Sequence, residues 1–476
     1  MQKLIRYIYL VLFALVLLIV FVSHNEFYLS LRQPPIISNL IVGILILFPI
    51  ILILRMIKKD INDKTYKKAL IIISIITFII QIIILRCTYF YTDWDVKTIR
   101  DIITTNDFLH NYYLTKYPNA LLYVAILKLY YSLPLIGNYY FPLLIFNALL
   151  VNLSGIITSL TIKRFTNNTK ALIGYIILIP LVLLSPWINI PYSDTLVILF
   201  PILIIYIYTK ENKKDLDYFL IGFLSILAYF IKPTAFIVFI GIIILSIIKL
   251  INKTLKLDKI KVLTIILGLF SSFVFCKGSI SLLHFVPYPN TNSFDMIHYL
   301  AMGQNNTTFG TFSKEDVEES DKYGRRYDIE KAFNRIKQRN IKEQLNFIEV
   351  KTLLNYNDGT FAFGREGENF YYQILSGNGK LSMLLRNYFY KDWKYNYIFK
   401  ELMQIIWLLV LSLAFLSGIK DKENKNTIIY LSLIGITLFL LIFEARARYL
   451  YCYAPIFVLA AIIGLNNITK KGDKHD

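Results

Sequence analysis

Residues 163–217 read KRFTNNTKALIGYIILIPLVLLSPWINIPYSDTLVILFPILIIYIYTKENKKDLD, and this stretch decides the fold class. Two apolar runs, 171–187 and 195–209, are separated by a short polar hinge and flanked by lysine-rich segments. A membrane-spanning helix needs about 20 apolar residues, and lysine concentrates on the cytoplasmic side of a membrane. The stretch therefore predicts a hairpin of two membrane helices, both short for a full crossing.

The same alternation of apolar runs and lysine-rich segments recurs along all 476 residues, of which 56% are hydrophobic, with a mean hydropathy of +0.53. Soluble domains contain about 45–50% apolar residues. We therefore predict an all-α polytopic membrane protein with about 12 transmembrane helices, in keeping with the run lengths that a bilayer requires. The predicted spans are 4–22, 36–55, 69–87, 139–162, 171–187, 195–209, 218–231, 234–250, 262–280, 397–417, 427–443 and 449–466.

Lysine in the short loops predicts the orientation. The lysine-rich segments fall on one side when these spans are drawn, and that side is cytoplasmic. They are 55–68, 163–170, 209–217, 249–262, 418–426 and 467–476, and the opposite side holds 23–35, 88–138, 188–194, 281–396 and 444–448. Both termini are expected to be cytoplasmic, with an uncleaved first span.

If the apolar stretch 120–136 also crossed the membrane, the lysine-rich segment 163–170 would lie on the outer side. The stretch 120–136 is predicted to be an interfacial helix on the outer leaflet, beside the alternative of a true span with inverted topology after it. The chain then divides into an N-terminal transmembrane module, 1–280, with a first large outer loop, 88–138. An extracytoplasmic, mainly helical domain, 281–396, and C-terminal transmembrane helices, 397–476, follow.

The net charge of +19 indicates topology and contact with anionic lipid, not a nucleic-acid partner, because the lysines lie at the ends of apolar runs. No Walker A loop, GxGxxG after a strand, or HExxH is present. The three cysteines Cys87, Cys276 and Cys452 are far apart and support neither a disulfide framework nor a zinc site.

Four polar clusters lie on the predicted outer face. In the first, Tyr91 to Asp95, Asp93 or Asp95 could act as a general base, or could cap a helix over 95–105. In the second, Lys116 to Asn119, the lysine could contact a lipid phosphate, or could simply extend its charged end toward water.

The third cluster, Pro191 to Asp194, places an acidic residue at the mouth of two spans. Asp194 could orient a sugar hydroxyl or a base, or cap the helix that begins at Thr195. In the fourth cluster, Glu444 to Tyr449, Arg446 and Arg448 could bind phosphate, or could pair with Glu444. Lys232, in another outer hairpin, would add a further positive charge.

Together these clusters resemble the GT-C superfamily of membrane glycosyltransferases, which includes protein O-mannosyltransferase, aminoarabinose transferase and glycosyltransferase 39-type families. The family's carboxylate in the first large outer loop matches Asp93 or Asp95, and Asp93 is preferred because it is nearer the membrane. The other matching elements are Lys116 to Asn119, Ser185 to Asp194, His298 to Gly303, Asn357 to Phe361, and Glu444 to Tyr449 with Pro455. Two extra spans before that loop, and the missing second proline after Pro118, depart from the family pattern.

The resemblance implies an inverting transfer of a sugar from a polyprenyl phosphate to a glycan, lipid or protein acceptor, on the outer face of the plasma membrane. The Ile/Lys/Asn-rich composition favours undecaprenyl as the polyprenyl carrier. The implied catalytic residues are Asp93, Asp95 and Asp194; the implied phosphate-binding residues are Lys116, Arg446 and Arg448; the supporting residues are Glu444, Tyr117 and His298. No cofactor is certain, and a divalent cation is possible at Asp93 and Asp95.

Three other classes remain open from the sequence. A polymerase of undecaprenyl-diphosphate-linked polysaccharide repeats has a similar layout, but lacks the early acidic outer loop. A lipid or glycan transporter would show internal repeats and charges at the bilayer midplane, whereas here the charges lie at the outer edge. A purely structural scaffold would not need four polar clusters on one face.

Overall fold

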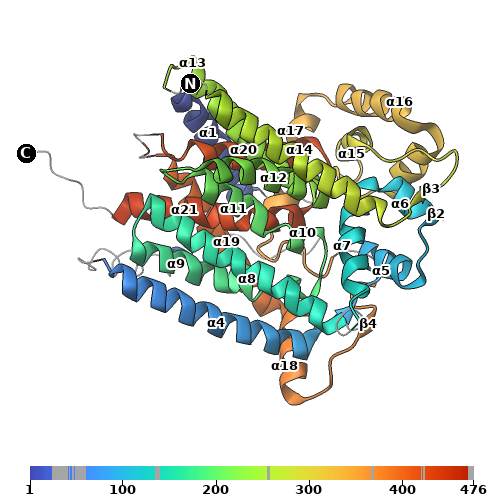
Figure 1. Cartoon of the computed structure of the whole chain (residues 1–476), viewed down its shortest axis with the longest axis horizontal. Coiled ribbons are helices and arrows are strands. Elements are labelled where there is room, and N and C mark those ends of the chain that lie inside the picture. The colour runs from blue at the N-terminus through green and yellow to red at the C-terminus, as the bar shows by residue number, and fades with distance from the viewer. Residues whose placement is uncertain are drawn as a thin grey trace, which may run out of the picture.

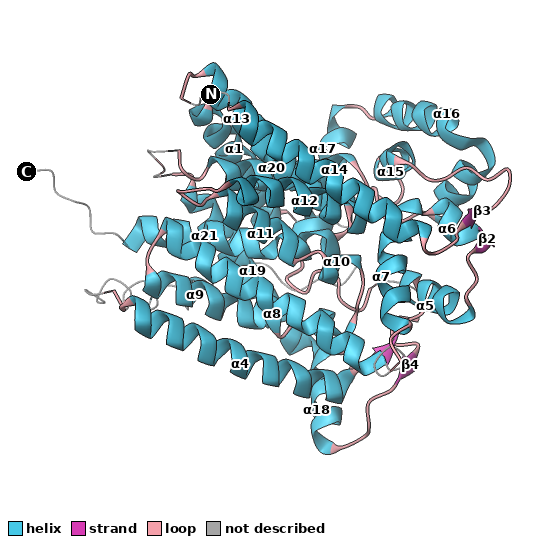
Figure 2. Cartoon of the chain, in the orientation of Figure 1, coloured by secondary structure: helices cyan, strands magenta, loops and turns pink. Residues whose placement is uncertain are grey.

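The computed structural model describes residues 1–23, 60–134, 140–254, 258–365, 369–419 and 424–469, together with residues 41, 43–45, 48 and 421. Apart from residues 41, 43–45 and 48, the predicted span 36–55 lies outside the described residues, as do residues 56–59 of the loop after it. Within the described part the secondary structure is helical, apart from four strands of two or three residues. Figure 2 shows this predominance of helix.

Seven helices of the described part are long and apolar enough to cross a membrane. The chain is therefore an all-α polytopic membrane protein. The seven are α1 (Gln2–Val22), α4 (Asp63–Thr88), α8 (Tyr140–Phe165), η4 with α13 (Pro233–Phe236, Ile237–Ile251), α14 (Lys259–Ser281), α19 (Asn396–Ser417), and η5 with α21 (Ala447–Tyr453, Ala454–Thr469).

Four further predicted spans are shorter apolar segments. They are α9 with η2 (Asn168–Leu178, Ile179–Leu183), α10 and α11 (Ser193–Leu196, Leu199–Tyr208), α12 (Asp215–Ile231) and α20 (Thr427–Ile442). Pro180 explains the shape of the first, because proline lacks the backbone N–H that a continuing α-helix requires. The backbone changes there to the π-helical turn η2.

The apolar stretch 120–136 forms α7 (Leu121–Tyr131), which has 11 residues. At 1.5 Å per residue it is about 16 Å long, roughly half the hydrocarbon thickness of a bilayer. This segment is therefore too short to cross a membrane as a single helix.

Glycine allows several helices to approach closely. A methyl group at Gly222 of α12 would overlap the backbone of α14 at Ile265, and one at Gly268 of α14 would overlap the backbone of α12 at Phe219. Small residues at helix contacts are the usual way in which membrane helices pack. Among the seven helices of membrane-spanning length in the described part, the most enclosed is α21, whose segment is 94% buried and which packs against α19, α8 and α9.

One end of the molecule, at the right of Figure 1, gathers described parts of the first large loop, 88–138, and of residues 281–396. Strand β1 (Phe90–Tyr91) pairs antiparallel with β4 (Gln373–Ile374), and β2 (Leu109–Asn111) pairs parallel with β3 (Val286–Pro287). The first large loop is thereby joined to residues 281–396. The Ala445 N–H also donates a hydrogen bond to the Gly310 carbonyl at 2.7 Å. This bond links the hairpin 444–448 to residues 281–396.

The opposite end gathers lysine-rich segments that are far apart in the sequence. Lys163 pairs with Asp63 at 2.5 Å, Lys170 Nζ donates to Asn466 at 2.8 Å, and Arg6 donates to the Asp421 carbonyl. These contacts gather residues of the predicted cytoplasmic segments 55–68, 163–170 and 418–426 at one end of the molecule.

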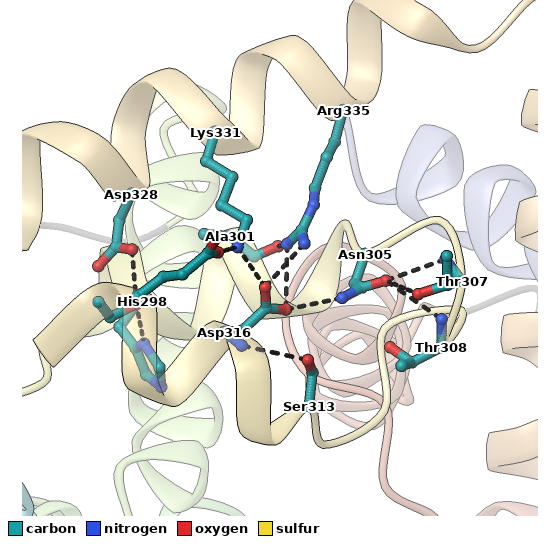
Figure 3. A network of polar contacts seen from close by, with 12 residues as sticks. His298, Ala301, Asn305, Thr307, Thr308, Ser313, Asp316, Asp328, Lys331 and Arg335 are labelled. Carbon is teal, nitrogen blue, oxygen red and sulfur yellow. Dashed lines mark hydrogen bonds and ion pairs between the residues drawn. The ribbon is translucent and has the colours of Figure 1, made fainter. Parts of the chain in front are cut away.

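Residues 281–396 contain α15 (Met296–Gly303), α16 (Lys314–Gln338), α17 (Ile341–Tyr356) and α18 (Lys380–Phe389). Figure 3 shows the polar network that joins α16 to α15 and to the loop after it, with Asp316 near its centre. The Asp316 carboxylate accepts hydrogen bonds from Arg335 at 2.7 Å, Lys331 at 2.5 Å and Asn305 at 2.8 Å. Burial acts to raise the pKa of Asp316, but these donors outweigh it and lower that pKa.

Candidate functional site

Five charged residues from three predicted outer hairpins meet in what we term the charge cluster: Asp194, Lys232, Glu444, Arg446 and Arg448. Asp194 lies at its centre and is 1% exposed. One carboxylate oxygen is 2.5 Å from Lys232 Nζ, and the other is 3.7 Å from Arg448 Nε. A buried carboxylate is tolerated when cations compensate it in this way.

Local sequence explains how Asp194 and Lys232 reach each other. Asp194 is the second residue of α10, whose N-cap is Tyr192. The interpretation of Asp194 as a helix cap is therefore wrong, because its carboxylate points to the two cations instead. Lys232 ends α12 in an extended conformation, and Pro233 begins the next turn, so the lysine lies at the bend of a helical hairpin.

Glu444 fixes the second half of the cluster. It accepts hydrogen bonds from Arg446 Nε and from the Tyr449 hydroxyl, each at 2.8 Å. Burial acts to raise the pKa of Glu444, but Arg446, Tyr449 and Arg448 together outweigh it and lower that pKa. The predicted alternative of a Glu–Arg pair thus holds for Arg446, whereas Arg448 extends to Asp194.

Aromatic rings surround these cations. The Arg448 guanidinium carbon lies 4.7 Å from the Trp94 ring centroid and 5.4 Å from that of Tyr192. Lys232 Nζ lies 4.0 Å from the Tyr449 centroid. Such cation–π contacts strengthen where water is excluded, so the rings both shield and orient the positive charges.

The two early carboxylates have different partners. Asp95 is the first residue of α5 (Asp95–Thr105), and its side chain accepts a hydrogen bond from the Tyr192 hydroxyl at 3.0 Å. Asp93 accepts from the Asn369 N–H at 2.6 Å and so faces residues 281–396. Neither side chain caps α5, whose N-cap is Trp94 without a side-chain hydrogen bond, so the capping interpretation is wrong. Asp95 is the one brought to the charge cluster.

Three successive residues present buried polar atoms with no hydrogen-bond partner among the described residues. They are Thr92 Oγ1, Asp93 Oδ1 and Trp94 Nε1, and Thr234 Oγ1, two residues after Lys232, is a fourth. Nearly all buried polar atoms in proteins are hydrogen-bonded, and exceptions gather at functional sites. This segment therefore offers donors and acceptors beside the charge cluster.

Lys116, Tyr117 and His298 lie outside the charge cluster. Lys116 is 1% exposed, forms an ion pair with Asp321 of α16, and donates to the Asn292 carbonyl at 3.0 Å. It does not extend toward water, and its charge is already compensated by a carboxylate. Burial lowers the pKa of Lys116.

His298 is joined to Tyr117 through the ring of Phe294, which stacks on the imidazole at 4.1 Å. Its Nδ1 is 2.8 Å from the Ser320 hydroxyl, which in turn donates to Asp328 at 2.6 Å. Burial lowers the pKa of His298 to about 4, so the ring is neutral at physiological pH. His298 thus belongs to the packing of α15 against α16.

Among the described residues, no three His, Cys, Asp or Glu side chains gather closely enough to hold a metal ion. Asp93 and Asp95 contact different partners, Asn369 and Tyr192, and do not form a shared ligand set. The residues present therefore do not fit the divalent cation considered from the sequence.

Sequence reasoning missed two features of this site. Lys232 was counted only as an extra charge, although a lysine on the predicted outer side, against the positive-inside trend, was a signal for it. Lys351, which contacts the hairpin that carries Arg446 and Arg448, lies on a helix with no distinguishing pattern. Its role depends on contacts between distant segments.

A family model described as "Conserved hypothetical integral membrane protein" matches residues 1–469. No curated protein and no solved structure matches the chain.

Proposed function

The chain belongs to the family of conserved hypothetical integral membrane proteins, and we propose that it is a membrane glycosyltransferase. It transfers a sugar from a polyprenyl-phosphate donor to a glycan, lipid or protein acceptor of the cell envelope. The observation that carries this proposal is the convergence of Asp95 with Lys232, Arg446 and Arg448 within an aromatic shell. Such a site supplies a base at one side and fixed cations at the other.

The reaction needs two kinds of group. A base takes the proton of the acceptor hydroxyl, whose oxygen forms a bond to the anomeric carbon with inversion. The bond between that carbon and the phosphate oxygen breaks, and its electron pair remains on the lipid phosphate. Asp95 is the base in this proposal, in place of Asp93, because Asp95 contacts Tyr192 beside the charge cluster.

The growing charge on the phosphate is stabilised by cations that are already fixed in position. Asp194 and Glu444 hold Lys232, Arg446 and Arg448 through ion pairs. Preorganised charges of this kind need little rearrangement as the transition state forms, and losing one typically costs about 3–4 kcal/mol of its stabilisation. We assign Lys116 a structural role, because it lies outside the charge cluster and pairs there with Asp321 of α16.

The site is assigned to the outer face of the plasma membrane, with both termini in the cytoplasm. Support comes from lysine: the segments that meet at the opposite end of the molecule are rich in it, as cytoplasmic loops are. The lipid donor would then enter from the outer leaflet.

Replacing Asp95 tests the proposal. Purified protein in liposomes is expected to consume a polyprenyl-phosphate sugar, and Asp95→Asn to slow this by about 10²–10⁴-fold, the usual contribution of a general base. Asp93→Asn is expected to reduce the rate less.

The matched control is Asp101→Asn, on the same helix, where the half-buried carboxylate pairs with Lys97 and Arg100. It should leave the rate unchanged. If the wild-type protein consumes no monophosphate-linked sugar, the proposal is wrong. If Asp93→Asn alone loses activity, Asp93 is the base.

A further inference from the structure

Lys351 is a fully buried lysine in the middle of α17, on the predicted outer side of the molecule. Its Nζ donates to two backbone carbonyls, those of Gly303 and, at 2.6 Å, Phe443. Gly303 ends α15, and Phe443 directly precedes Glu444. The lysine therefore joins a helix of residues 281–396 to the start of the hairpin that carries Arg446 and Arg448.

Further contacts join the same two parts. Gln304 Nε2 donates to the Ile442 carbonyl at 2.7 Å, and the Ala445 N–H donates to the Gly310 carbonyl at 2.7 Å. A side chain on Gly310, whose φ is +77°, would place its Cβ 2.8 Å from Lys351 Nζ. The backbone of 442–445 is thus held at three successive points, with Lys351 in the middle.

We infer that Lys351 is a positioning residue that holds the backbone of 442–445, and thereby Glu444, Arg446 and Arg448, in the charge cluster. That these cations serve catalysis rests on the proposed function; their placement by Lys351 does not. A buried amine with two carbonyl acceptors is costly to lose, because removing it leaves both acceptors without a partner.

The same lysine makes this contact sensitive to pH. Burial lowers the pKa of Lys351 to about 7, the nearby Arg339 guanidinium acts in the same direction, and Glu444 acts to raise it. When the contact opens, the lysine returns to its ordinary value of 10.5. The opened state then binds more protons between about pH 7 and 10.5, so opening becomes rarer as pH rises through that window.

Hydrogen exchange of the amides in 442–446 measures the opening, with the whole protein in lipid nanodiscs. Lys351→Met is expected to raise the opening constant about tenfold or more at pH 8, because the two carbonyls lose their donor. The wild-type opening constant, corrected for intrinsic exchange, should fall by up to about tenfold per pH unit above pH 7, and the variant should show no such slope.

Two controls separate position from titration. Gln304→Met removes the contacts to Ile442 and to Arg339 but no titrating group, so it should speed exchange at every pH and keep a pH slope. Lys342→Met, an exposed lysine on the same helix, should change neither. If Lys351→Met does not fold, Lys351→Arg keeps a charge that does not titrate and should also abolish the slope.

The inference would be overturned if the amides of 442–446 exchanged in Lys351→Met as slowly as in the wild type and with the same pH slope. A pH slope retained in Lys351→Arg would also overturn it. Failure of the proposed function gives a different result. In that case the wild-type protein consumes no polyprenyl-phosphate sugar, yet Lys351→Met still opens the hairpin.

Discussion

Asp194 is a carboxylate held by Lys232 on one side and Arg448 on the other, and almost no water reaches it. The sequence around Asp194 predicted a polar residue at the mouth of two spans. It could not predict the partners of Asp194, because Lys232 and Arg448 lie 38 and 254 positions further along the chain (232 − 194 and 448 − 194). Residue types were therefore readable from the sequence, whereas the pairing that makes them a site depended on the packing of three hairpins.

Asp194→Asn should destabilise the fold, because it leaves two buried cations with less compensation. Removing one partner of a buried pair typically costs about 3–5 kcal/mol. Thermal unfolding can be followed with a thiol-reactive dye, since Cys87, Cys276 and Cys452 are all buried and become reactive on unfolding. The exposed pair of Asp258 with Lys261 provides the control, and Asp258→Asn should shift the midpoint little. Equal midpoints for the two variants would contradict this assignment.

At the level of helices, apolar run length predicted position well. The predicted spans 262–280 and 397–417 correspond to α14 (Lys259–Ser281) and α19 (Asn396–Ser417), because lysine and asparagine mark where each apolar run starts. Irregular elements were harder to predict. The β1–β4 and β2–β3 pairs join segments far apart in the chain, and two or three residues carry too little pattern to reveal such pairing.

The contact between α12 and α14 gives a prediction about helix packing. Gly222→Leu would force a side chain into the backbone of α14, and overpacking of this kind typically costs about 1–3 kcal/mol. The expected result is a lower midpoint of thermal unfolding. Gly278→Leu is the matched control, since Gly278 lies on α14 with nothing within 4 Å of an added Cβ. If the midpoint for Gly222→Leu were as high as that of the control, α12 and α14 could separate without loss of stability.

Across the whole molecule, the described contacts link loops of the same predicted side to one another, and the two groups lie at opposite ends (Figure 1). Lysine distribution predicted this grouping because it depends on composition averaged over many loops, which is less sensitive to local error than any single contact. The family match supports an integral membrane protein and agrees with the seven apolar helices of membrane-spanning length.

The orientation can be tested by cysteine labelling. A membrane-impermeant thiol reagent applied to intact cells should label Lys342→Cys, an exposed position on α17, and should leave Asn212→Cys, in a lysine-rich loop, unlabelled. Permeabilised cells should label both, and the native cysteines should stay silent because they are buried. Labelling of Asn212→Cys alone in intact cells would reverse the orientation.

Helix α21 is enclosed by its neighbours, yet it comes last among the described helices. During synthesis it leaves the ribosome after the helices that pack around it, so the nascent protein waits in the membrane with its centre unfilled. Arg448 lies in the same segment, at the turn that leads into α21. Insertion of this helix therefore completes the interior and delivers the guanidinium to Asp194 in one step, and a chain released early would have neither.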